Sequence, residues 1–167
     1  MMAKIRAAIP GRDDADDYHK AIEAFLTALF YPSLTLPQIE YPIHRGRKRI
    51  DIAYANVAQR GFFGWVGNHY PSAQIFVECK NISEDPANPE LDQLAGRFSP
   101  RRGKVGLLVC RGIGDKTLMA ARCRDAADDD RGYIIALDDD DLETLARQLR
   151  EEKRLSLLRE RFEALIA

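Results

Sequence analysis

Two short apolar segments stand out in the hydrophobic pattern of the chain: one ends in charged residues, and the other carries Asp51 between Ile50 and Ile52. Residues 74–79 hold three consecutive β-branched or aromatic side chains between polar neighbours, which predicts a buried strand. Alternate residues of a strand point to the same face, so Glu78 and Lys80 would lie about 6.5 Å apart. Such charges are costly to bury unless partners satisfy them. The alternative is a strand that emerges into solvent, with an incidental Glu-x-Lys pattern.

The segment upstream predicts a second charged strand beside the first. Residues 34–43 read as an extended segment, and their two internal prolines indicate an edge strand or an irregular one. A turn at 45–48 would lead into a strand over 49–54, in which three apolar residues share one face and Asp51 lies on the other. Neighbouring strands are about 4.8 Å apart, so Asp51 and Glu78 could face each other.

A helix is predicted between the acidic residues 13–17, which favour a helix N-terminus, and the Tyr31-Pro32 step that ends it. Its apolar residues recur at helical spacing, and Glu23 sits at the border of that face. Glu23 could therefore reach toward whatever the helix covers. Residues 59–70 are rich in Gly, Asn and aromatic residues, and predict a long loop or distorted hairpin. We expect its aromatic side chains in the core rather than on a substrate-contacting lip.

The second half of the chain alternates between helical and strand patterns. Asn88-Pro89 is typical of a helix start, and apolar residues continue in phase to Phe98. Residues 105–110 are entirely apolar, as in a central strand covered on both faces. A helix at 115–127, a strand at 133–137 and a helix begun by the acidic run 138–141 follow, with a phase slip near Glu152 that implies two helices or one bent helix. This order predicts an α/β protein with a mixed sheet flanked by helices.

Composition narrows the class of protein. The 167 residues fit a single domain, and 46% hydrophobic with 31% charged residues excludes a disordered chain. No apolar run approaches the roughly 20 residues that span a bilayer, and residues 1–12 lack the apolar core of a signal peptide. Cys79, Cys110 and Cys123 are odd in number and lack CxxC spacing, which indicates reduced thiols in the cytoplasm rather than zinc ligands. The three histidines show no metal-ligand spacing.

The net charge is only −1, but charges of each sign are segregated along the chain. Acidic residues gather in runs near positions 13–17, 128–130 and 138–141. Basic residues form two clusters: Arg45, Arg47, Lys48 and Arg49, and then Arg97, Arg101, Arg102 and Lys104. This pattern suits a protein with one face that binds a polyanion such as nucleic acid. Ordinary solvated charge is the alternative for either cluster taken singly.

The charged strands together predict a metal-dependent hydrolytic site. Mg²⁺ is held by one or two carboxylates, with water and substrate phosphate completing its shell, and Asp51 and Glu78 could supply them. The backbone carbonyl of Cys79 could add a ligand. Lys80 could orient the attacking water or help to deprotonate it, and offset charge on the phosphate oxygens.

The sequence Ile50-Asp51, followed on the next strand by Glu78-Cys79-Lys80 within an α-β-β-β-α-β order, resembles the PD-(D/E)xK nuclease superfamily. The likeness is greatest to its restriction-endonuclease-like branch, which includes Mrr-type enzymes and Holliday junction resolvases. It covers roughly residues 14–110 and leaves 111–167 as a C-terminal α/β extension. The resemblance implies Mg²⁺, for which Mn²⁺ substitutes, and roles for a helix glutamate and a helix glutamine, which Glu23 and Gln93 match in placement.

Four features depart from that pattern. The leading Pro is absent before Asp51, and Asp51 and Glu78 are separated by more residues than in compact members. Arg97 stands where some relatives place a Tyr. A helical wheel also sets Gln93 opposite the apolar face of its helix, toward solvent.

These observations lead to three hypotheses. The first is a Mg²⁺-dependent DNA endonuclease of a restriction, defence or DNA-processing system, with Asp51, Glu78, Lys80, Glu23 and Gln93 at its site; RNA stays open as a substrate. The second is a non-catalytic nucleic-acid-binding module with the same fold. The third, a small nucleotide- or protein-binding domain, is disfavoured because no GxGxxG or Walker-type loop is present. A homodimer would let two sites address both DNA strands, with the last helix as the candidate surface.

Overall fold

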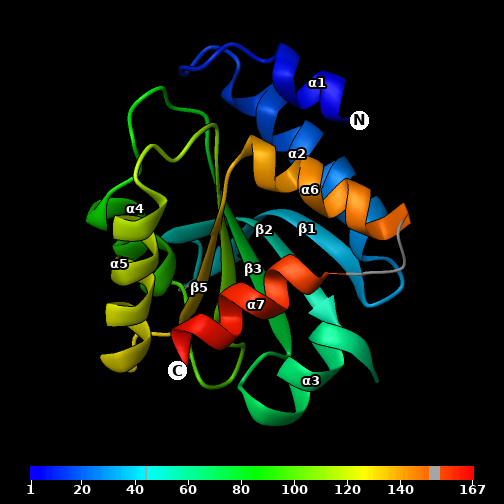
Figure 1. The fold of residues 1–167 in the computed structure, drawn as a ribbon, viewed down its shortest axis with the longest axis vertical. Coiled ribbons are helices and arrows are strands. Elements are labelled where there is room, and N and C mark those ends of the chain that lie inside the picture. The colour runs from blue at the N-terminus through cyan, green and yellow to red at the C-terminus, as the bar shows by residue number, and fades with distance from the viewer. Residues whose placement is uncertain (44, 151–154) are drawn as a thin grey trace.

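The strands form one mixed sheet that carries helices on both faces (Figure 1). A computed structural model describes residues 1–43, 45–150 and 155–167. Within them the strands are β1 (Leu34–Ile43), β2 (Lys48–Asn56), β3 (Gln74–Lys80), β4 (Val105–Cys110) and β5 (Tyr133–Leu137). The helices are α1 (Met2–Ala7), α2 (Ala15–Phe30), α3 (Gly61–His69), α4 (Asn88–Ala95), α5 (Lys116–Asp128), α6 (Asp139–Arg150) and α7 (Ser156–Leu165). The predicted α/β class with a flanked mixed sheet is confirmed.

The connections between strands explain the mixed topology. The sheet order is β1-β2-β3-β4-β5, with antiparallel pairing from β1 to β3 and parallel pairing from β3 to β5. A tight turn joins β1 to β2, whereas α4 and α5 provide the crossovers that parallel neighbours require. β5 pairs with β4, so the chain after β4 adds a fifth strand to the same sheet.

The two faces of the sheet are covered by different helices. Tyr54 of β2 bonds the Glu23 carbonyl of α2 on one face, at 3.2 Å. Phe76 of β3 stacks against Phe98, just beyond α4, on the other. Figure 1 shows α4 and α5 on one side, and α2, α6 and α7 on the other. All six residues of β4 are buried between these layers, as its apolar sequence predicts.

Proline shapes the outer strand as expected. β1 lies at the edge of the sheet, and its register with β2 shifts between Thr35 and Gln38, next to Pro37. An edge strand tolerates the missing N–H of proline because its outer side has no partner strand.

The loop or hairpin that we expected at 59–70 is wrong, because residues 61–69 form α3. Gly61, with φ of +72°, starts this helix, and Phe62, Phe63 and Val66 are buried along one face. Three glycines lower the helical propensity of the segment, so burial of this face must stabilise it. The prediction that the aromatic side chains join the core is confirmed for Phe62 and Phe63.

The two ends of the chain also differ from expectation. α1 was not predicted; its buried residue is Ile5, and it packs on α2 and α6. The phase slip near Glu152 lies outside the described residues, and α6 and α7 flank it as separate helices. α7 buries Leu158, Phe162 and Leu165 within its own chain, with Phe162 against the rings of α3 and β5. The apolar face that we expected to be free for a second subunit is therefore used internally.

Helix boundaries account for the remaining differences. α4 ends at Ala95, short of Phe98, and residue 87 rather than Asn88 occupies its N-cap position, where Glu90 bonds the Ala87 N–H. The strands at 105–110 and 133–137 and the helix after Asp115 lie where the pattern predicts them. No helix of the described residues is long and apolar enough to cross a membrane.

Candidate active site

The pairing of β2 with β3 brings Asp51 and Glu78 to the same end of the sheet. Ile52 pairs with Val77, and the same register would set Asp51 opposite Glu78. Continued by that register, both residues would start from the side of Phe76, which α4 covers, and the Asp51 carboxylate also comes within 4.0 Å of His19 of α2 at this end of the sheet. The register pairing ends at Ile52 and Val77, so the strands separate where the two acids begin.

At this point the side chain of Asp51, rather than a main-chain carbonyl of β2, accepts a hydrogen bond from β3. The bond from the Asn56 N–H to the Ala73 carbonyl shows which residue pairs of β2 and β3 exchange hydrogen bonds. Every second pair does so, and by that rule the Cys79 N–H would donate to the Ile50 carbonyl. Instead, the Cys79 N–H donates to Asp51 Oδ2 at 2.8 Å. The side chain of Asp51 is thereby oriented by the main chain of β3, directly beside Glu78.

Glu78 forms a small network with Lys80 and Gln93. Lys80 Nζ lies 3.0 Å from Glu78 Oε1 and donates to Gln93 Oε1 at 2.8 Å, while Gln93 Nε2 also donates to Glu78 Oε1. Gln93 is exposed, as the helical wheel indicates, yet its side chain reaches back to the end of β3. The helical wheel therefore predicted the exposure of Gln93 but not its hydrogen bonds.

The second oxygen of Glu78 has a different environment. The residue is 1% exposed, and Oε2 is buried without a hydrogen-bond partner among the described residues. Burial, with the nearby Asp51 carboxylate, raises the pKa of the Glu78 carboxyl to about 7, although Lys80 and Arg97 act to lower it. A buried carboxyl oxygen that lacks a partner next to a second carboxylate can accept a metal ion or a proton.

Glu23 is not joined to this network by any hydrogen bond or ion pair found in the described residues. Its Oε1 accepts from the Thr27 hydroxyl at 3.0 Å, and Thr27 in turn contacts the Tyr54 hydroxyl. Tyr54 belongs to the face of β2 opposite Asp51. Glu23 thus forms part of the packing between α2 and the sheet.

His19 was missed by the sequence analysis, and it lies nearer to the acids. It is one turn before Glu23 on α2, and its Nε2 is 4.0 Å from Asp51 Oδ2. Its side chain is 28% exposed, so it lies at the border between Asp51 and solvent. Its spacing of four residues from Glu23 indicates that the two side chains share one side of the helix. The histidines show no metal-ligand spacing, so His19 was not considered a site residue.

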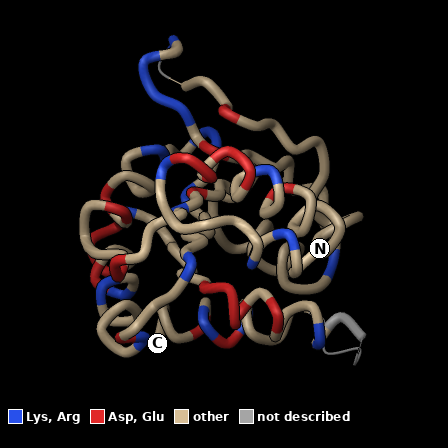
Figure 2. Tube along the Cα trace, turned by 90° about the horizontal axis from the view of Figure 1, so that it is seen from above, with Lys and Arg blue, Asp and Glu red and all other residues tan. Residues whose placement is uncertain are grey.

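The first basic cluster belongs to the β1–β2 hairpin, and the second directly follows α4 in the chain. Arg45, Arg47 and Lys48 are exposed at the tip of the β1–β2 hairpin, which projects from the body of the protein in Figure 2. The ammonium of Lys48 lies beside Gly96, at the end of α4. Arg49, also exposed, pairs with Glu40 at 3.2 Å. This hairpin therefore places positive charge near the helix that carries Gln93.

The second cluster is only partly available to a ligand. Arg102 donates to the Arg97 carbonyl, and the Nε atoms of both are buried without a partner in the described part of the chain. Arg101 is exposed, whereas Lys104 is engaged by Asp130 at 2.8 Å. Arg97 is close enough to Glu78 to affect its pKa, so the positive charge of this cluster extends to the acids.

Within residues 1–43, 45–150 and 155–167, no group of three or more His, Cys, Asp or Glu side chains is arranged to hold a metal ion. Asp51 and Glu78 are thus a pair of carboxylates rather than a closed protein cage. Comparison of the chain with known protein families, curated proteins and solved structures found no match. Function is therefore inferred from the geometry and chemistry of the site.

Proposed function

We propose that the protein is a metal-dependent nuclease that hydrolyses phosphodiester bonds of DNA. The observation that carries the proposal is the juxtaposition of Asp51 and Glu78 where the β2–β3 ladder opens, with Lys80 bonded to Glu78. Two acids and a lysine at one end of a sheet are the minimal set for hydrolysis assisted by a divalent ion.

The residues present fit Mg²⁺ or Mn²⁺. Such ions use one or two carboxylates and complete their shell with water and substrate phosphate, so a closed protein cage is not required. Glu78 Oε2, buried without a partner in the described chain, and the Asp51 carboxylate would hold the ion, and the Cys79 carbonyl is the third candidate ligand. A bound ion polarises the phosphate and makes water more acidic. Lys80, which Glu78 and Gln93 hold in place, would meet the negative charge that develops on the phosphate oxygens.

The order of elements supports the finer fold assignment, a restriction-endonuclease-like core. α2, β1, β2, β3, α4 and β4 follow the αβββαβ sequence, with α3 inserted between β2 and β3. In this proposal β5 and the helices after it extend the core. The exposed hairpin residues Arg45, Arg47 and Lys48, together with Arg97, Arg101 and Arg102, would contact backbone phosphates. A restriction, defence or DNA-processing role follows from the resemblance to that branch, and a homodimer would need a surface other than the apolar face of α7.

The test is cleavage of supercoiled plasmid DNA with Mg²⁺, with Mn²⁺ and with a chelator. Asp51→Asn, Glu78→Gln and Lys80→Met should each abolish cleavage. Asn is preferred to Ala at position 51, because its side-chain oxygen can still accept from the Cys79 N–H. Lys20→Met, which removes an exposed lysine, and Glu160→Gln on α7 are matched controls that should cut at the wild-type rate. Wild-type cutting by the Lys80 or Glu78 variant would remove the proposed site.

The second candidate is a nucleic-acid-binding module that does not hydrolyse DNA. It is favoured by the lack of a group of three metal-binding side chains in the described residues. It predicts salt-sensitive retention of DNA, with no change in plasmid form at any concentration of Mg²⁺ or Mn²⁺. Nicked or linear products that vanish with chelator would decide for the nuclease.

A further inference from the structure

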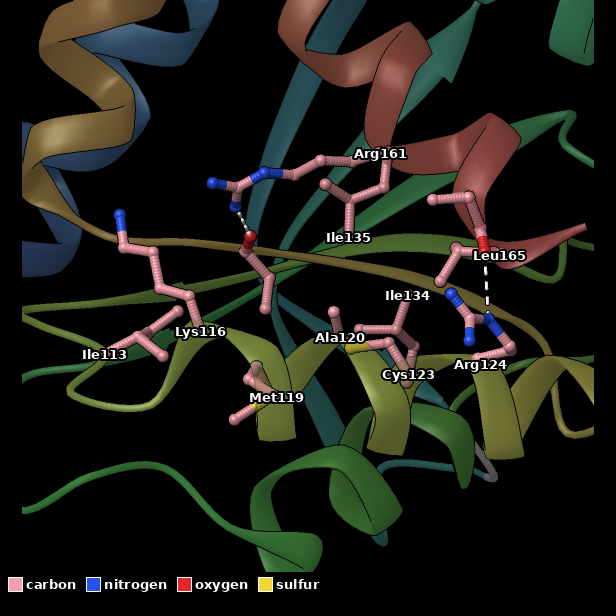
Figure 3. A pocket seen from close by; sticks show the side chains of 12 residues that line it. Ile113, Lys116, Met119, Ala120, Cys123, Arg124, Ile134, Ile135, Arg161 and Leu165 are labelled. Atoms are coloured by element: carbon pink, nitrogen blue, oxygen red, sulfur yellow. Dashed lines mark hydrogen bonds between the residues drawn. The ribbon is translucent and has the colours of Figure 1, made fainter. Parts of the chain in front are cut away.

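A cavity of about 170 Å³ lies along the outer edge of β5, away from the acidic pair. β5 is the last strand of the sheet, and α5 and α7 pack against it from opposite faces. Their side chains line a partly open space at the edge of the strand, seen in Figure 3. All of these elements belong to the extension that follows β4.

The wall of the cavity is largely apolar. Met119, Ala120, Ile135 and Leu165 contribute hydrocarbon or thioether surface. Burial raises the pKa of the Cys123 thiol to about 11, so this group, which also lines the cavity, is uncharged near neutral pH. An apolar cavity of about 150 Å³ is known to accept benzene, so this volume suits a single aromatic ring. The sulfur of methionine makes favourable contacts with ring edges.

The rim of the cavity is positively charged. Lys116 and Arg161 line one end, but both are engaged by Asp141, at 3.2 and 2.6 Å. Arg124 is exposed, and its Nε donates to the Ala164 carbonyl across the gap between α5 and α7 (Figure 3). No hydrogen bond or ion pair of its two terminal nitrogens is found among the described residues. Among the cations of this rim that the structure describes, Arg124 is therefore the one with free donors, and the guanidinium fork matches a carboxylate.

We propose that this cavity binds a small aromatic monocarboxylate, with its ring between α5 and α7 and its carboxylate on Arg124. The apolar wall selects the ring, and the rim selects the negative charge. The site bridges two helices that are distant in sequence, so a bound ligand would hold α7 against the sheet. This site is independent of the proposed nuclease activity and is tested without it.

Benzoate is the probe, and the methyl resonance of Met119 in protein with ¹³C-labelled methionine methyl groups is the readout. Benzoate should shift this resonance saturably, and neutral benzyl alcohol should bind at least about tenfold more weakly, because it lacks the charge-assisted bonds. Arg124→Gln should reduce benzoate affinity to that of benzyl alcohol. Arg122→Gln is the matched control: Arg122 lies on the same helix but donates to Pro86, and its loss should leave the affinity unchanged.

A variant that fills the cavity tests the position of the ring. Ala120 is exposed and lines the cavity, so Ala120→Leu should fold normally and abolish the benzoate shift. Circular dichroism would verify that both Arg variants and the Ala120 variant remain folded. The proposal is overturned if benzoate causes no saturable shift up to its solubility limit, or if the folded Arg124 or Ala120 variant binds benzoate as tightly as the wild type.

Discussion

Replacing Glu78 by Gln is expected to stabilise the protein at pH 8, although Glu78 is fully buried and hydrogen-bonded. Burial and the Asp51 carboxylate raise the pKa of Glu78 from 4.5 to about 7. Between these two pH values the folded protein therefore holds a proton that the unfolded chain has released. Stability must then fall as the pH rises from about 4.5 to 7, and remain low above that range.

The size of the effect follows from the same two values. A shift in pKa from 4.5 to about 7 corresponds to about 3 kcal/mol of lost stability once the carboxyl is ionised in both states. Gln resembles the protonated form of Glu78 in shape, and its oxygen can still accept from Lys80 and Gln93. We therefore expect Glu78→Gln to recover about 3 kcal/mol at pH 8, which in a chain of this size raises the melting temperature by roughly 6 to 12 °C.

Urea and thermal unfolding at pH 5, 6, 7 and 8 would measure this difference. The gain should be small at pH 5 and grow toward pH 8, since only the wild type loses stability over that interval. Glu160→Gln makes the same chemical change at an exposed position of α7 and should show no such growth. A Glu78→Gln variant that is less stable than the wild type at pH 8, or a gain that does not depend on pH, would refute the reasoning.

Other predictions follow from the same structure. Mg²⁺ should raise the melting temperature of the wild type more at pH 8 than at pH 6, because a metal ion must displace the carboxyl proton at the lower pH. Gly132→Ala should lower the free energy of unfolding in urea by about 2 kcal/mol or more, since its φ is +121° and an added Cβ would overlap the ring of Phe98; Gly112→Ala, with nothing within 4 Å, is the control. Lys48→Gln should reduce the dependence of DNA binding on salt by about one ion, measured by fluorescence anisotropy, and an unchanged slope would exclude a phosphate contact.

Most of the strands could be predicted because their signals are local. β4 and β5 are uninterrupted apolar runs bounded by polar residues and Gly, so their limits follow from composition alone. α3 could not be predicted in this way. Its glycines indicate a loop, and the helix exists because distant residues such as Phe162 and Phe30 pack on its aromatic side chains. Contacts of this kind are not encoded in the local pattern.

In the candidate site, too, some positions follow from the local sequence pattern and others depend on how distant elements pack. The proximity of Asp51 and Glu78 follows from strand alternation and from the antiparallel pairing of β2 with β3, and was expected. The contacts of Gln93 and the position of His19 depend on how α4 and α2 pack against the sheet, which periodicity does not determine. Glu23 has the predicted place on its helix, yet its carboxylate bonds Thr27. A long side chain at the border of a helix face can turn either way, so its partner is decided by packing.

The opening of the β2–β3 ladder explains how two acids can be tolerated side by side. Like charges directly opposed in a sheet destabilise it, and here each acid avoids that cost differently. Asp51 is stabilised by the Cys79 N–H, which the opened ladder leaves free to donate. Glu78 has no such donor on Oε2 within the described residues, and keeps its proton to about pH 7. The destabilisation of the site therefore comes mainly from the buried Glu78 carboxyl beside Asp51. At pH 8, where the Glu78 carboxyl has lost its proton, a divalent cation would neutralise the carboxylate, so the charge that weakens the fold also favours metal binding there.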